Sequence, residues 1–213
     1  MTDLFKNKYR ISSARLQTWD YADNGLYFVT ICTANRESFF GELVETQSFA
    51  SPDNIAPLAD MPDNIMRLND LGKIIETEWL KTSELRPDMN LELQEYVVMP
   101  NHFHGIIYIG ENAYNDRYLA SGDAKHCVST SDTYDATFEG KNKFGPQYKN
   151  LSSIIRGFKS AVTNYARKND IPFNWQARFH DHIITSNDEY IRIADYIIDN
   201  PAKWQQDKFY INE

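Results

Sequence analysis

The feature that most constrains the fold is the stretch 95–109, EYVVMPNHFHGIIYI, in which two apolar segments flank a short corner. Residues 96–99 form an apolar run, and Pro100 followed by Asn101 is a typical turn signal. Aliphatic and aromatic residues resume immediately afterwards. The stretch therefore predicts a strand, a tight corner and a second strand, which together form the centre of an antiparallel sheet.

Two histidines at alternate positions of the second strand form a candidate metal site. Alternation places His102, His104 and Ile106 on one face of the sheet. Two imidazoles on one face can bind the same cation, because the strand holds both in a fixed direction. His180 and His182 repeat this spacing on another predicted strand. Spacing alone does not choose between the two pairs.

The composition predicts one soluble domain over residues 1–213, with enough chain for a substantial core. No segment approaches the roughly 20 apolar residues that a membrane helix needs, so no membrane partner is expected. The N-terminal residues lack the apolar segment of a secretory signal. Cys32 and Cys127 are the only cysteines, too few for a disulfide framework or a cysteine-based zinc site. We therefore expect a cytoplasmic protein.

The charge balance is acidic, with 30 acidic and 22 basic residues and a formal net charge of -8. Proteins that bind nucleic acids commonly carry basic patches, so this balance disfavours a nucleic-acid partner. A local basic strip is still compatible with it. If the partner is nucleic acid, we expect the acidic residues to concentrate away from the site.

The order of the predicted elements is β-α-β-β-α-β-α, interrupted by polar insertions at 44–64 and 111–147. The first six elements match the ferredoxin-like split β-α-β arrangement, an antiparallel sheet with packed helices, so the predicted class is α+β. The predicted strands are 25–33, 91–99, 102–109 and 178–184. The predicted helices run from Asn69 or Asp70 to before Pro87, from 151 to about 169, and from a capping box at Ser186 and Glu189 to Pro201.

The last predicted helix carries a row of polar groups along one edge. Tyr196 lies roughly 120° from the centre of the apolar stripe at about 100° per residue. Asn200 follows it by one turn, and Arg192 precedes it by one turn. This row is either a functional edge or a tyrosine at the core boundary with an ordinary helix-end residue. The residues alone favour the second interpretation.

Four blocks of the sequence resemble one family of enzymes. The block 96–107 resembles the His-hydrophobic-His motif of the HUH single-strand nucleases. The blocks 25–33, 174–184 and 195–204 look like further segments of the single-tyrosine transposases in that superfamily, especially those associated with repetitive extragenic palindromes in bacteria. The resemblance covers most of residues 10–204, outside the two insertions.

The resemblance implies roles for individual residues. His102 and His104 would bind a divalent metal, Mg²⁺ or Mn²⁺, together with Asn200, where some relatives have glutamine. Tyr196 would be the nucleophile that cleaves single-stranded DNA at hairpin or palindromic elements through a 5′-phosphotyrosine intermediate. Relatives include monomers and dimers, so a homodimer is compatible with the resemblance. The supporting residues near the site would be His180 and His182.

Basic residues near the second and third helices are candidates for phosphate contacts. The set comprises Arg156, Lys159, Arg178 and Arg192. A solvated basic helix face explains such residues equally well. Two other functions remain open: a domesticated protein that binds DNA hairpins without mobilising them, and an RNA-binding module of similar topology.

Overall fold

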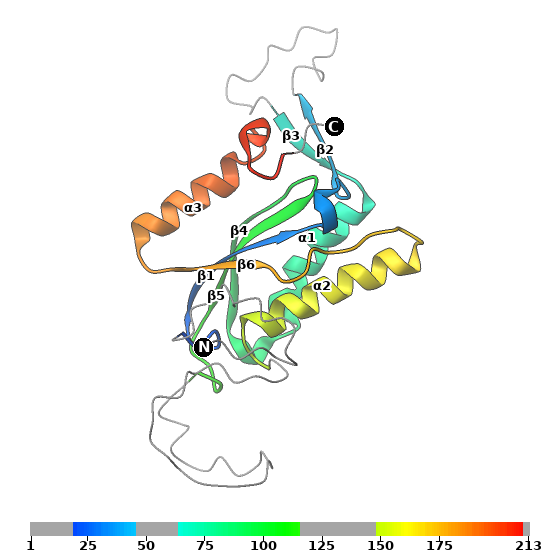
Figure 1. Cartoon of the computed structure of the whole chain (residues 1–213). Coiled ribbons are helices and arrows are strands. Elements are labelled where there is room, and N and C mark those ends of the chain that lie inside the picture. The colour runs from blue at the N-terminus through cyan, green and yellow to red at the C-terminus, as the bar shows by residue number, and fades with distance from the viewer. Residues whose placement is uncertain (1–18, 46–63, 116–147, 211–213) are drawn as a thin grey trace, which may run out of the picture.

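The protein has an α+β architecture built on a four-stranded antiparallel sheet, as predicted (Figure 1). The computed structural model describes residues 19–45, 64–115 and 148–210. Each pair of neighbouring strands is antiparallel. Their order is that of the ferredoxin-like split β-α-β unit, which confirms the predicted topology. Across the sheet, the strands are β4 (Leu91–Val98), β5 (His102–Ile109), β1 (Gly25–Cys32) and β6 (His180–Ile184).

Helices cover both faces of this sheet. The first two lie side by side on one face, and the third crosses the opposite face over β4 and β5 (Figure 1). All three were predicted, with boundaries that differ by one or two residues. They are α1 (Asp70–Glu84), α2 (Leu151–Lys168) and α3 (Asn187–Asp199), and short 3₁₀ turns occur at η2 (Ala34–Arg36), η4 (Pro87–Met89) and η6 (Trp204–Gln206).

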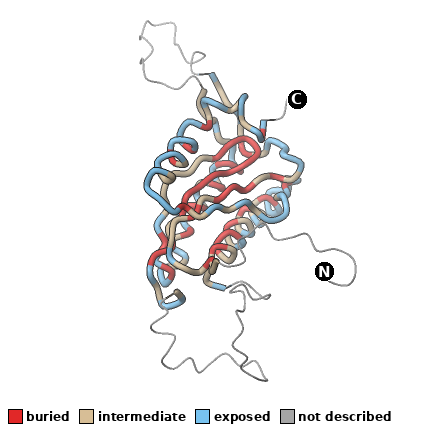
Figure 2. The backbone as a smooth tube through the Cα atoms, turned by 60° about the vertical axis from the view of Figure 1, so that its left-hand side comes forward, coloured by how far each residue is buried: buried red, intermediate tan, exposed pale blue. Residues whose placement is uncertain are grey.

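The main core lies between the sheet and the pair α1 and α2 (Figure 2). Trp79 of α1 is fully buried at its centre, with its ring centroid 4.8 Å from Phe103 and 5.6 Å from Phe158. A Cβ atom at Gly105 would lie 2.8 Å from the Trp79 indole, so glycine provides the space for this packing. The buried strand residues on this face include Tyr27, Val29, Ile31, Phe103 and Ile107.

A smaller apolar cluster fixes α3 on the opposite face. Ile197 and Ala194 of the helix pack with Ile106 of β5 and Ile184 of β6. Because side chains alternate along β5, the burial of Ile106 under α3 places the two preceding histidines of the same face beside that helix. The cluster therefore sets the position of α3 over the predicted site.

The prediction of a loop over 44–64 is wrong at both ends, where a two-stranded sheet forms. The strands β2 (Gly41–Glu45) and β3 (Asn64–Leu68) pair antiparallel, with Val44 opposite Ile65. Residues 46–63, which contain the three prolines that predicted a loop, lie outside the described residues. Most of the second insertion, residues 116–147, lies outside them as well.

Side-chain caps determine where the helices begin. The predicted N-cap Asn69 accepts a hydrogen bond from the Gly72 amide at 3.0 Å. The predicted capping box of α3 is only half formed, because Ser186 accepts from the Glu189 amide whereas the Glu189 carboxylate binds the Thr185 amide instead. Among the described residues, no helix is long and apolar enough to cross a membrane.

Candidate active site

The two histidines of β5 lie side by side beneath α3. His102 and His104 are almost completely buried, and their ring centroids are 4.5 Å apart. Burial lowers the pKa of His102 to about 3, with smaller contributions from the positive charges of Lys208 and Arg36. Burial also lowers the pKa of His104 well below its ordinary value. Both imidazoles are therefore neutral at physiological pH, the form in which histidine binds metals.

Hydrogen bonds orient both rings. The Asn101 amide nitrogen donates to the carbonyls of Arg36 and Phe209, so its oxygen faces His102 Nδ1 at 2.9 Å. An amide oxygen only accepts, and Nδ1 of His102 therefore carries the proton. This leaves His102 Nε2 with a free lone pair, and it has no hydrogen-bond partner among the described residues. Nδ1 of His104 lies 2.8 Å from the Thr30 hydroxyl.

Tyr196 of α3 reaches the same cluster. Its hydroxyl oxygen lies 3.2 Å from His104 Nε2 and donates to Asp207 Oδ2 at 3.2 Å. The side chain is partly exposed, and its ring contacts Phe28 edge to face. Burial, and to a smaller extent the Asp207 carboxylate, raise the pKa of Tyr196 to about 12. The phenol is therefore protonated at neutral pH and requires a proton acceptor to become a nucleophile.

Asn200 and Asp207 complete the cluster. Asn200 is buried at the C-terminal end of α3, one turn after Tyr196, and its amide nitrogen donates to Asp207 Oδ2 at 2.9 Å. This bond turns the Asn200 carbonyl oxygen away from the carboxylate, and that oxygen has no partner among the described residues. The sequence analysis missed Asp207, because nothing in its spacing from the histidines marks it.

The four side chains fit a divalent cation. The ligand atoms of His102, His104 and Asp207 lie within 4.8 Å of one another. Buried polar atoms without partners are rare in proteins, and of the three among the described residues, Trp79 Nε1 lies in the main core and His102 Nε2 and Asn200 Oδ1 belong to this cluster. A mixed set of imidazole nitrogens, an amide oxygen and a carboxylate is suited to a divalent ion. The geometry supports the predicted metal site.

Aromatic side chains of the C-terminal segment cover the histidines. The ring of His102 has its centroid 4.6 Å from Phe209 and 5.7 Å from Trp204. The carbonyl of Phe209 accepts a hydrogen bond from Asn101, which fixes this segment against the β4–β5 corner. The segment thereby brings Asp207 to the histidines. The sequence of this segment predicts no regular element.

The second histidine pair lies on the same face but outside this cluster. His180 pairs with Thr30 across β1 and β6, on the edge of the sheet, and both His180 and His182 are exposed. His182 Nε2 lies 2.7 Å from the Glu189 carboxylate. The position is compatible with the supporting role that the resemblance implies, which stays a prediction.

The four predicted phosphate-binding residues do not form one strip. Arg156 is exposed on α2, which packs on the opposite face of the sheet from Tyr196. Lys159 donates to the carbonyls of Gln176 and Arg178 at 2.8 Å each, and burial lowers its pKa to about 8. Arg178 and Arg192 are exposed, and the guanidinium of Arg192 lies 3.6 Å from the Glu189 carboxylate. Their role in binding DNA stays a prediction.

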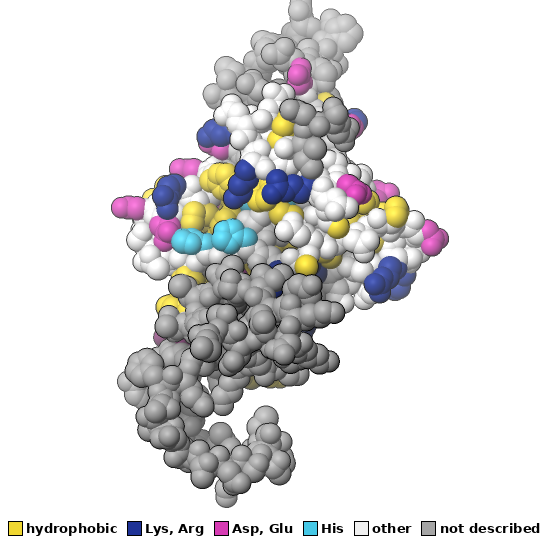
Figure 3. Space-filling model, in the orientation of Figure 1, with side chains coloured by type: hydrophobic (Ala, Val, Ile, Leu, Met, Phe, Trp, Pro, Cys, Tyr) yellow, Lys and Arg dark blue, Asp and Glu magenta, His cyan; other side chains and the backbone are white. Residues whose placement is uncertain are grey.

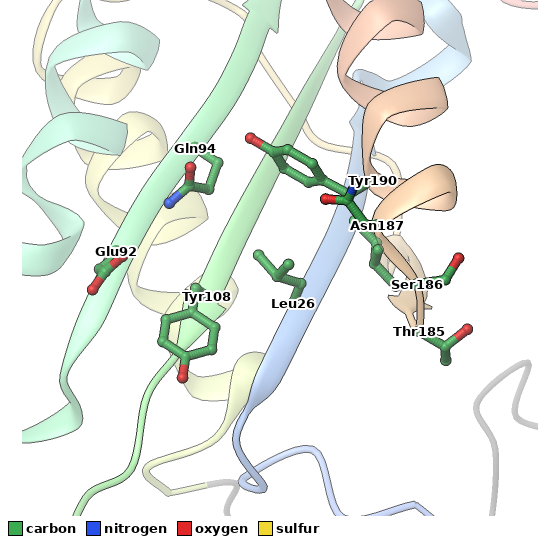
Figure 4. A pocket seen from close by; sticks show the side chains of 9 residues that line it. Leu26, Glu92, Gln94, Tyr108, Thr185, Ser186, Asn187 and Tyr190 are labelled. Carbon is green, nitrogen blue, oxygen red and sulfur yellow. The ribbon is translucent and has the colours of Figure 1, made fainter.

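The face that carries β6 is not uniformly negative. Exposed histidine and basic side chains gather between β6 and the segment that follows α3, and acidic side chains lie mainly toward the edges of this view (Figure 3). A shallow pocket of about 590 Å³ lies at the other end of α3, away from His102 and His104 (Figure 4). Its lining residues are Leu26, Glu92, Gln94, Tyr108, Ile184, Thr185, Ser186, Asn187 and Tyr190.

Comparisons with known proteins give one clear relative. No family model matches the chain. The chain is 32% identical over 201 residues to an uncharacterized protein of Haemophilus influenzae, a match that covers 94% of this chain and 93% of the relative. A solved structure of a REP-associated tyrosine transposase bound to a REP hairpin aligns with a TM-score of 0.48 and 20% identity, over 93% of this chain and 77% of that one. That protein is of the kind which the four sequence blocks resemble.

Proposed function

We propose a function for this chain, which belongs to the same family as the uncharacterized Haemophilus influenzae protein, from the geometry of its own site. The chain would act as a metal-dependent endonuclease and transesterase of the transposase type on single-stranded DNA with hairpin elements. The observation that carries the proposal is the Tyr196 hydroxyl at the edge of a buried cluster in which His102 Nε2 and Asn200 Oδ1 have no partner within the described structure. The sequence blocks support the choice of substrate.

The metal ligands in this proposal are His102, His104 and Asn200, with Mg²⁺ or Mn²⁺ as the ion. A bound divalent ion would polarise the scissile phosphate and orient it toward the tyrosine. The chain supplies the orientation of its own ligands. Asn101 fixes the tautomer of His102, and Asp207 accepts from the Asn200 amide nitrogen, which leaves the amide oxygen available as a ligand.

Tyr196 is the proposed nucleophile. Its phenolic oxygen forms a bond to phosphorus, the bond from phosphorus to the 3′-oxygen breaks, and the products are a 5′-phosphotyrosine and a free 3′-hydroxyl. The phenolic proton passes to Asp207, whose carboxylate already accepts its hydrogen bond, and the departing 3′-oxygen takes up a proton from solvent water. One phosphodiester replaces another, so rejoining by the reverse step requires no nucleotide cofactor.

The test is a denaturing gel of the full chain incubated with labelled single-stranded hairpin DNA and Mn²⁺. We expect a covalent protein–DNA band that depends on the metal and is absent from Tyr196→Phe. Asp207→Asn should slow its formation by about 10²- to 10⁴-fold, the usual contribution of a positioned acid or base. Tyr190→Phe is the matched control, because Tyr190 lies on the same helix but donates to Glu95 instead.

Two results would overturn parts of this proposal. A covalent band that persists in Tyr196→Phe would exclude this residue as the nucleophile. Hairpin DNA binding without a covalent band, on a broad panel of hairpins, would favour a domesticated DNA-binding protein. Binding of RNA in preference to every DNA tested would favour the RNA-binding module.

A further inference from the structure

Two cations lie near one aromatic ring that packs against the site. The Arg36 guanidinium lies 5.1 Å from the ring centroid of Phe209, and the Lys208 ammonium lies 4.9 Å from it. Phe209 in turn packs against His102. Both cations lower the pKa of that buried histidine, as positive charges near it must. The two cations therefore affect the electrostatics of the catalytic cluster.

The position of Arg36 is fixed by hydrogen bonds between distant parts of the chain. Its guanidinium donates to the Lys208 carbonyl at 2.8 Å, although the two residues are 172 positions apart. Its own carbonyl accepts from Asn101, which also binds the carbonyl of Phe209. Arg36 and the preceding Asn35 both have positive φ angles, 59° and 55°, which non-glycine residues rarely adopt. The surrounding contacts hold this strained turn and aim the guanidinium.

Neither cation has an acidic partner in the described parts of the chain. The neighbouring Asp207 is already engaged, since its Oδ2 accepts from Tyr196 and Asn200 and its Oδ1 accepts from the Phe209 amide. Half of the other basic side chains in the described parts of the chain are paired with carboxylates. Ion pairs with carboxylates occur at Arg67, Lys73, Lys81, Lys149, Arg192 and Lys203.

We propose that Arg36 and Lys208 form a clamp for a backbone phosphate of the single strand that enters the site. Two like charges held near one ring without a carboxylate repel each other, and an anion between them would relieve that repulsion. Arginine offers a planar set of donors that suits phosphate, and lysine adds a mobile point charge. The clamp rests on the proposed function and adds a substrate contact which neither the motif nor the resemblance identified.

The test is the affinity of the full chain for a fluorescein-labelled oligothymidylate, measured by anisotropy in EDTA at several salt concentrations. EDTA removes the metal, so the measurement reports strand binding and not cleavage. The test variant is Arg36→Gln/Lys208→Gln. The control variant is Lys73→Gln/Lys81→Gln, which changes the net charge equally but lies on α1, on the opposite face of the sheet.

The double variant should bind the strand more weakly and with less dependence on salt. Each neutralised phosphate contributes about 0.7 to the slope of log affinity against log salt for single strands, so loss of the clamp on one phosphate should reduce the slope by about 0.7. Raising the salt from about 50 to about 200 mM should therefore weaken the wild type about 2.6-fold more than the variant. The control should keep the wild-type slope.

Single variants separate a clamp from a structural role. Lys208→Gln removes only an exposed ammonium, and Arg36→Lys keeps the charge while it weakens the hydrogen bond to the Lys208 carbonyl. For a clamp, Arg36→Lys binds closer to wild type than Arg36→Gln does, and Lys208→Gln loses about half of the effect of the double variant.

The outcomes distinguish the clamp from the function on which it rests. Unchanged affinity and slope in the double variant, with a wild type that binds the strand and forms the covalent band, would overturn the clamp alone. An equal loss in the α1 control would overturn it too, because net charge would then explain the effect. A wild type that neither binds single strands nor forms the band would overturn both proposals.

Discussion

The two faces of the central sheet are built from the same strands but meet different requirements. On the face toward α1 and α2, β1 and β5 contribute only buried apolar side chains, among them Val29, Phe103 and Ile107. On the face toward α3, the alternate positions of the same strands hold Thr30, His102 and His104, which are also buried. One face gains stability from burial, and the other buries polar groups that lose hydration.

The site face leaves more buried polar atoms without partners than the packed face does. Among the described residues, Trp79 Nε1 is such an atom on the packed face, whereas both His102 Nε2 and Asn200 Oδ1 are on the site face. Such atoms destabilise a fold by about 1–3 kcal/mol each unless a ligand satisfies them. The comparison teaches that strand alternation lets one sheet keep its stability on one side and an incomplete binding site on the other.

The largest expected effect on stability is on the packed face. Trp79→Ala removes a fully buried side chain at the centre of the core and should lower the free energy of unfolding by about 3–5 kcal/mol, measured by urea denaturation. Tyr196→Phe on the site face should change it by no more than about 0.5 kcal/mol, because the ring remains and the hydroxyl is partly exposed. Equal losses in the two variants would contradict the separation of the faces.

A second expected effect distinguishes the buried histidines from the exposed pair. His102→Ala should weaken Mn²⁺ binding, measured by electron paramagnetic resonance, by at least about 100-fold, since even indirect supports of metal ligands contribute 10- to 100-fold. His182→Ala is the matched control, because His182 is exposed and lies beside Glu189, outside the cluster. A greater loss of affinity in His182→Ala would indicate that the metal binds at β6 instead.

A third expected effect is a pH dependence of stability without metal, which is small near neutral pH and grows as the pH falls. The pKa of His102 is about 3 in the folded chain and 6.5 when unperturbed, so the unfolded chain binds more protons between these values. The free energy of unfolding in EDTA should therefore be highest above pH 6.5 and decrease as the pH falls toward 3. Each such histidine contributes up to about 1.4 kcal/mol per pH unit.

The check is a series of urea denaturations at decreasing pH, in EDTA, for the wild type and His102→Gln. The variant should show a shallower decrease, because one titrating group is gone while His104 remains. A decrease of equal steepness in both proteins would show that His102 does not titrate as its burial requires.

Local patterns in the sequence predicted the fold and the directions of the candidate side chains, and the family resemblance selected His102, His104 and Tyr196 among them. Alternation predicted that His102 and His104 share a face, and helical spacing placed Tyr196 and Asn200 one turn apart on one edge. These predictions depend only on periods of two and 3.6 residues, which the backbone imposes wherever a strand or helix forms. The predicted ends of the insertion at 44–64 were wrong. The prolines within it indicate a loop, so the short strands on either side were not predicted.

Tertiary structure alone decided which of these groups meet. The contact between Tyr196 and His104 joins residues 92 positions apart and depends on where the small cluster around Ile106 sets α3. Asp207 and Arg36 reach the site from irregular segments, which carry no period that could place them. A chain's local pattern determines the direction of a side chain within its element. Only the packing of elements against one another determines its partners.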